Sequence, residues 1–141
     1  MKDLYNDLLP VKTLTPILGH TTAEGTGAAV DLAGFEGALM AAHVGISGDT
    51  LSGSLKWTVQ FQESDTTTPG DFADIAAADL IGGANAVVID AAAEDDVIIA
   101  RSYIGAKRYV RVLFTQTGTH TNGTPIAAVV IKGRPRHAPV A

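Results

Sequence analysis

The sequence contains no cysteine, so neither a disulfide bond nor a thiolate metal site can stabilise the folded chain. Aromatic residues are scarce at 6%, although 46% of residues are apolar, so the interior must consist mainly of Ala, Val, Ile and Leu. Long apolar runs are also missing, because the longest, residues 126–131, is far shorter than the ~20 residues that cross a bilayer. The first ten residues mix charges with leucine and lack the apolar core of a secretory signal. We therefore expect no membrane span and a fold stabilised by packing and strand pairing.

Acidic residues are absent from the last third of the chain. All 15 acidic residues lie within residues 1–96 beside three lysines, whereas residues 97–141 carry seven basic residues, which gives parts of about −12 and +7. One interpretation is that a folded sheet interleaves the two parts and pairs their charges internally. The other is a basic face or tail that docks on an acidic partner. A nucleic-acid partner is disfavoured because an acidic protein repels phosphates.

The 141 residues suffice for one domain with its own core, and 15 glycines suit short strands joined by turns better than helices. The clearest strand pattern lies at residues 55–62, where Trp57, Val59 and Phe61 alternate with polar residues. Trp57 and Phe61 would also suit a sugar-stacking platform, but their alternation with Val59 favours core packing.

Turn signals divide the chain into about eight strands, which predicts an all-β fold, an antiparallel β-sandwich that is jelly-roll-like. The predicted strands are residues 28–32, 38–46, 55–62, 72–75, 86–89, 97–104, 108–114 and 125–132. Residues 38–46 are apolar on both faces, which is typical of a central strand, with a short helix as the alternative. Residues 47–54 and 105–107 are expected to be hairpin loops, residues 69–70 the centre of a type II turn, and residues 76–80 one helical turn.

Prolines mark both ends of the predicted sandwich domain, residues 21–133. Pro10 and Pro16 remove strand hydrogen-bond donors, so residues 1–20 are expected to form an extended N-terminal arm, an edge strand or a lead-in. Residues 134–141, with Pro135, are expected to form an extended C-terminal tail.

Catalytic and metal-binding patterns are weak. The four histidines (His20, His43, His120 and His137) are scattered, which does not suit zinc, and Glu94, Asp95 and Asp96 are better explained as a solvated turn than as a calcium loop. No Gly-x-Ser-x-Gly, phosphate-binding or dinucleotide-binding motif is present. The sequence therefore favours a non-enzymatic protein without cofactors that acts through its surfaces. Tyr103, Tyr109 and Arg111 are candidates for a protein interface, with cross-strand pairing as the equal alternative.

Four segments resemble small structural proteins of tailed-bacteriophage heads. They are residues 60–65 (QFQESD), 72–75 (FADI), 79–82 (DLIG) and 103–112 (YIGAKRYVRV), and the resemblance covers roughly residues 55–133. It implies a capsid decoration or cement protein, made in the host cytoplasm and located on the capsid surface of the virion. Its expected partners are the major capsid protein and further copies of itself, a trimer being favoured over a pentamer, with neither nucleic acid nor membrane.

Alternatives to this function are a head-fibre base, a head–tail connector or, in another class, a carbohydrate- or host-surface-binding sandwich. For the decoration protein we expect the N-terminal arm to dock through an apolar group and the tail to meet acidic groups of the capsid or of a sister subunit. The residues of the arm are Leu4, Leu8, Leu9 and Val11, and those of the tail are Arg134, Arg136 and His137.

Overall fold

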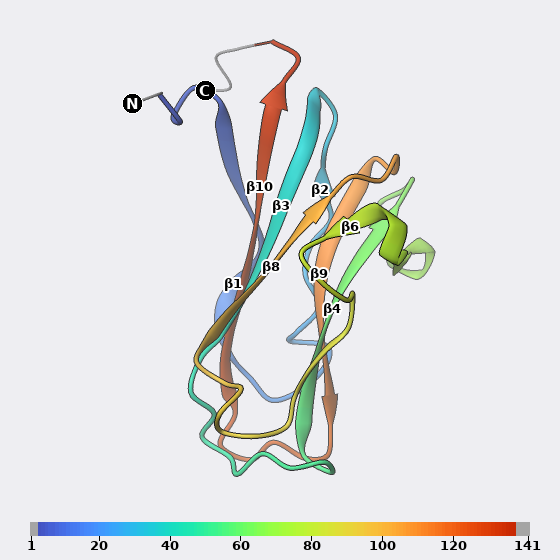
Figure 1. Ribbon diagram of the computed structural model, residues 1–141. Coiled ribbons are helices and arrows are strands. Elements are labelled where there is room, and N and C mark those ends of the chain that lie inside the picture. Colours follow the sequence, from blue (N-terminus) through green and yellow to red (C-terminus); the bar gives the residue numbers. More distant parts are fainter. Residues whose placement is uncertain (1–2, 138–141) are drawn as a thin grey trace.

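The computed structural model describes residues 3–137, which form two antiparallel sheets packed face to face (Figure 1). The first sheet has the order β1 (Leu8–Gly19), β10 (Thr124–Pro135), β3 (Phe35–Val44), β8 (Val97–Tyr103) and β6 (Leu80–Ile81). The second has the order β2 (Val30–Asp31), β9 (Tyr109–Thr117), β4 (Lys56–Ser64) and β5 (Ala73–Asp74), and β7 (Val87–Ile89) also pairs with β4. The predicted all-β sandwich is confirmed.

The strand order is that of a jelly roll. Strand β1 pairs with β10, β2 with β9, β3 with β8 and β4 with β7, so the chain is arranged as one long antiparallel ribbon folded over on itself. The short strands β5 and β6 add to this pattern, one in each sheet. The 3₁₀ turns η1 (Pro69–Asp71) and η2 (Ala77–Asp79) flank β5, and η2 confirms the predicted helical turn.

Two loops predicted to be hairpins instead connect strands of different sheets. Residues 47–54 connect β3 to β4 and residues 105–107 connect β8 to β9, and in both cases the two strands belong to different sheets. Each loop therefore crosses from one layer to the other. The predicted type II turn is also wrong, because residues 69–71 form η1 and Gly70 does not have the positive φ that a type II turn requires at this position.

Most of the predicted N-terminal arm is instead the edge strand β1, the other interpretation of this segment. An edge strand tolerates Pro10, and Pro16 lies where the register with β10 shifts. The predicted tail starts later than expected, because β10 continues to Pro135, which pairs with Phe35. Strand β10 reaches Pro135 by way of Arg134, whose φ of 53° lies in the left-handed region. Residues 1–2 of the arm and 138–141 of the tail lie outside the described residues.

The core lies between the sheets. Trp57, Val59 and Phe61 are fully buried, as the alternation of residues 55–62 predicts, so neither aromatic ring is available for a sugar platform. Met40 and Val44 face them from β3, which is the middle strand of the first sheet and confirms the central-strand prediction. The core is therefore built from both sheets in alternating positions.

One side of the sandwich is closed by a segment whose backbone forms hydrogen bonds with both sheets. The Gly27 amide donates to the carbonyl of Val112 on β9 at 2.9 Å, and the next amide, of Ala28, donates to the carbonyl of Thr13 on β1 at 2.6 Å. The Thr13 hydroxyl donates in turn to the Ala28 carbonyl at 2.7 Å. The segment before β2 therefore joins the edges of the two sheets.

Charges from the two parts of the sequence pair in space. Lys107 pairs with Asp65, Arg108 with Asp31 at 2.8 Å, and Arg136 with Glu36 at 3.8 Å. Each pair joins a base from residues 97–141 to an acid from residues 1–96, which supports internal pairing. The hydrogen bond from Arg108 lowers the pKa of Asp31. All of these pairs are exposed, so solvent screening leaves each of them little effect on stability.

Candidate functional site

Two groups of predicted interface residues meet at one end of the molecule. Strand β1 begins where β10 ends, with Leu8 opposite Gly133 and Leu9 opposite Lys132 (Figure 1). The apolar group of the predicted arm and the basic group of the predicted tail therefore lie at the same end of the first sheet. We call this region the terminal end and define it by Leu4, Tyr5, Leu8, Leu9, Arg134, Arg136 and His137. Val11 lies further along β1, opposite Val130, and is partly buried.

The terminal end combines exposed apolar and basic side chains. Leu4 is 64% exposed and Tyr5 is 76% exposed, while Leu8 and Leu9 are partly buried. Sequence reasoning missed Tyr5, because nothing in its local pattern indicates a surface position. Arg134, Arg136 and His137 are exposed, and no ion pair joins Arg134 to another described residue. Exposed Leu, Tyr and Arg side chains together are typical of a protein-binding surface.

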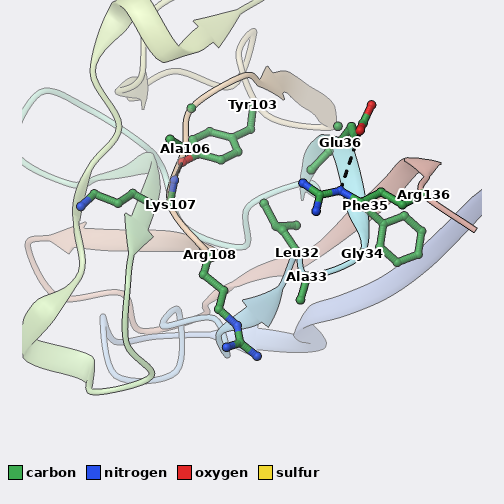
Figure 2. Close-up of a pocket in the computed structure, with 13 residues that line it drawn as sticks. Leu32, Ala33, Gly34, Phe35, Glu36, Tyr103, Ala106, Lys107, Arg108 and Arg136 are labelled. Atoms are coloured by element: carbon green, nitrogen blue, oxygen red, sulfur yellow. Dashed lines mark hydrogen bonds and ion pairs between the residues drawn. The ribbon is translucent and has the colours of Figure 1, made fainter.

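A hollow of about 710 Å³ adjoins the terminal end and is lined by residues 32–38, 105–108, Tyr103 and Arg136 (Figure 2). Arg136 pairs with Glu36 (Figure 2). Lys107 and Arg108 pair with Asp65 and Asp31, which are not among the lining residues. All of its cations therefore have carboxylate partners within the chain, so the hollow does not have the excess positive charge that an anionic ligand requires.

Tyr103 is buried, and its predicted role at an interface is wrong. Its side chain is 3% exposed, and its hydroxyl donates to Glu63 Oε2 at 2.5 Å and accepts from the Lys107 amide at 2.8 Å. Burial raises the pKa of the Tyr103 phenol, with the hydrogen bond to Glu63 acting in the same direction. Through these two hydrogen bonds the Tyr103 side chain links the loop between β8 and β9 to Glu63 on β4. The sequence does not indicate that Tyr103 is buried, because apolar residues 97–100 occupy both faces of the predicted strand.

Arg111, the second of the predicted interface residues, is also buried. It lies on the outer side of β9, but the segment before β5 folds over it. Its guanidinium lies 4.2 Å from the centre of the Phe72 ring, and Nε donates to Gln62 Oε1 at 2.9 Å. Desolvation lowers the pKa of Arg111. Tyr109 is partly exposed, under the guanidinium of Arg108, and so remains a candidate for the interface.

A second candidate surface is the outer face of the first sheet, which we call the apolar face. Residues directly opposite one another in a sheet point to the same side. The rows pointing away from the core are Ile131, Leu39 and Ser102; Val129, Ala41 and Ala100; and Ala127, His43 and Ile98. Ile98 is 65% exposed and Leu39 is 40% exposed. An open sheet face is ordinarily polar, so this face is unusual.

The outer face of the second sheet has the ordinary composition. Its cross-strand pairs are Lys56 and Thr117, Thr58 and Thr115, Gln60 and Leu113, and Gln62 and Arg111. Polar side chains predominate there, so the two outer faces differ in character. Sequence reasoning took the apolar residues 38–46 as a sign of a central strand. It could not show that none of the other described residues covers one side of that strand.

At the end of the sandwich opposite the terminal end, Asp49 links the loop between β3 and β4 to the loop between β9 and β10. Its carboxylate accepts hydrogen bonds from the amides of Asn122 and Gly123, each at 3.0 Å, and from the Asn122 side chain at 3.1 Å. The hydrogen bond from the Asn122 amide lowers the pKa of Asp49 below its ordinary value of 3.8. The ring of His120 stacks on Trp57, with centroids 4.7 Å apart, and its Nδ1 lies 3.7 Å from Asp49 Oδ2.

Replacing Asp49 with asparagine is expected to lower the thermal midpoint Tm by several degrees at pH 7. Because the pKa is lowered on folding, the carboxylate stabilises the protein above pH 3.8, and this contribution disappears as the pH falls through the folded-state pKa. The difference in Tm between variant and parent should therefore vanish at the acid end of a calorimetric pH series. Asp96→Asn, an exposed acid at the same end, is the control and should change little at pH 7. A difference that persists unchanged below the folded-state pKa would contradict this account.

No group of three or more His, Asp or Glu side chains within residues 3–137 is arranged to hold a metal ion. Among the same residues, no helix has the length and apolar character to cross a membrane. Comparison with known proteins found no match among protein-family models, curated proteins or solved structures.

Proposed function

We propose that this protein is a non-enzymatic component of a tailed-bacteriophage head that binds the outside of the capsid through its terminal end. The observation that carries the proposal is the meeting, at one end of the sandwich, of two groups from opposite ends of the chain. Leu4 and Tyr5 present exposed apolar surface at the same end of the first sheet as Arg134, a cation without an ion-pair partner among the described residues. Such a surface suits a protein partner with an apolar depression and acidic rim.

The jelly-roll order of the strands supports this proposal at the level of architecture, because the fold is used by viral capsid proteins as well as by lectins and cupins. Fold alone does not decide function, so the terminal end and the resemblance of four sequence segments to phage head proteins carry the specific assignment. The mechanism is additive: an assembly of several copies contacts several capsid subunits, and the links between copies turn modest single contacts into lasting attachment.

The proposal predicts that Leu4→Ser combined with Tyr5→Ser weakens capsid binding by at least about tenfold, the loss expected when central apolar anchors of an interface are removed. The two side chains are exposed, so the fold should be unaffected. Purified protein would be added to capsids of the same phage prepared without it, and bound protein measured by co-sedimentation over a range of concentrations. Electron microscopy of the decorated particles would show whether the protein lies on the capsid faces, at vertices or at the portal.

The matched control is Ile46→Ser, which removes an aliphatic side chain of similar exposure, 68%, from a loop at the opposite end. It should bind as the parent does. Equal binding by the control and the double variant would contradict attachment through the terminal end. Absence of any parental binding to such capsids would contradict the proposed function itself.

A further inference from the structure

We infer that two copies of this chain pack their apolar faces together to form a two-fold symmetric dimer. This inference goes beyond the proposed function and is independent of it, because it concerns a different surface and requires no capsid. It rests on the size of the apolar face, on the small number of its ionisable side chains and on its shape.

The apolar face is large enough for a stable dimer. It extends over the long strands β1, β10, β3 and β8 of the first sheet. With strands about 4.8 Å apart and a rise of about 3.3 Å per residue, ten residues on each of β1, β10 and β3 and the seven of β8 cover roughly 600 Å² in projection. Side-chain relief increases the accessible area, so each copy would contribute on the order of the 800 Å² per partner of a standard interface.

Polarity decides which surface can cover this face. Among its outward-pointing residues only Lys12, at the edge strand, and His43 carry ionisable groups. The outer face of the second sheet, by contrast, would bury Lys56 and Gln60 against aliphatic side chains without partners. Of the two outer sheet faces, the one whose polarity matches the apolar face is the same face of another copy. A contact between identical surfaces is two-fold symmetric and closed.

The shape of the face is also self-complementary. A groove of about 350 Å³, lined mostly by apolar atoms, lies between β1 and β8, with Ala41 and Ala127 among its lining residues. Ile98, 65% exposed, borders this groove. Under a two-fold axis Ile98 of each copy enters the groove of the other, and the two sheets stack about 10 Å apart as in an ordinary sandwich. A two-fold pair differs from the trimer that the resemblance favours, so the two expectations are distinguishable.

Sedimentation equilibrium of the purified protein over a range of concentrations tests the inference. The parent should have twice the monomer mass of 14.5 kDa. Ile98→Glu should weaken association at least about 100-fold, because a dimer would bury the new carboxylate twice. The control Val88→Glu places the same charge at an exposed aliphatic position on β7 of the second sheet and should remain a dimer.

Far-UV circular dichroism would verify that each variant is folded, and Leu39→Lys, on a different strand of the apolar face, is the second test variant. A parent that is a monomer or a trimer would overturn the inference and leave the face to a different partner, such as the capsid. Dimers of both Ile98→Glu and Leu39→Lys, or loss of the dimer in Val88→Glu, would overturn it equally.

Discussion

Replacing Trp57 with alanine is expected to lower the free energy of unfolding by about 3–5 kcal/mol, the usual loss for a large aromatic side chain removed from a core. Trp57 is fully buried in the middle of the sandwich, and its ring stacks on that of His120. Its indole Nε1 donates to Thr124 Oγ1 at 3.1 Å, which links β4 of the second sheet to β10 of the first. Loss of the ring therefore removes packing and a contact between the sheets. Urea unfolding followed by far-UV circular dichroism would measure the change.

Trp57→Phe is the matched control, because it keeps most of the apolar area and removes the indole N–H. The Thr124 hydroxyl also lies 2.9 Å from the Ser47 hydroxyl and so retains a partner. We expect a loss of about 1–2 kcal/mol, made up of a hydrogen bond and some packing. A loss below about 1 kcal/mol for the alanine variant would mean that Trp57 is not central to the core.

Replacing Gly27 with alanine is expected to destabilise the protein by about 1–3 kcal/mol or more, as overpacking of a close contact does. A Cβ atom at this position would lie 2.4 Å from the Val112 carbonyl oxygen and 2.5 Å from Thr13 Oγ1. The nearer obstacle is backbone of β9, which no change of rotamer can relieve. The segment joining the two sheet edges would therefore have to move, and its hydrogen bonds to Val112 and Thr13 would weaken. Thermal and urea unfolding would both show the loss.

Gly53→Ala is the control for this substitution. No atom lies within 4 Å of the position that a Cβ would take at Gly53, and its φ is not in the left-handed region. The change in unfolding free energy should stay within about 0.5 kcal/mol, because the added methyl group meets no atom and alanine restricts the unfolded chain only slightly more than glycine does. Equal effects at the two glycines would refute the account of the joined sheet edges.

The sequence by itself determined that this chain is a β-sandwich and which residues of its clearest strand face the core. The alternation around Trp57 sufficed, because side chains in a strand point to opposite faces at a period of two, and burial of the apolar set is the dominant favourable term in folding. The uneven distribution of charge along the sequence also indicated that acidic and basic residues from the two parts could pair in the folded protein. Acids and bases from the two parts of the chain pair across loops and strands, as for Arg108 and Asp31.

Only the tertiary structure decided which strands are neighbours and which surfaces remain uncovered. The loop at residues 105–107 looks like a hairpin, but the period of two carries no information about whether the next strand joins the same sheet or the opposite one. Arg111 alternates as an exposed residue would, and is covered by Phe72, almost 40 residues earlier in the sequence. The apolar face arises in the same way: β3 and β8 are apolar on both sides, and a strand of this kind needs cover on both sides. The fold provides cover on one side alone, since the second sheet packs against the inner face. Such long-range packing depends on the arrangement of the whole chain, which no local pattern encodes.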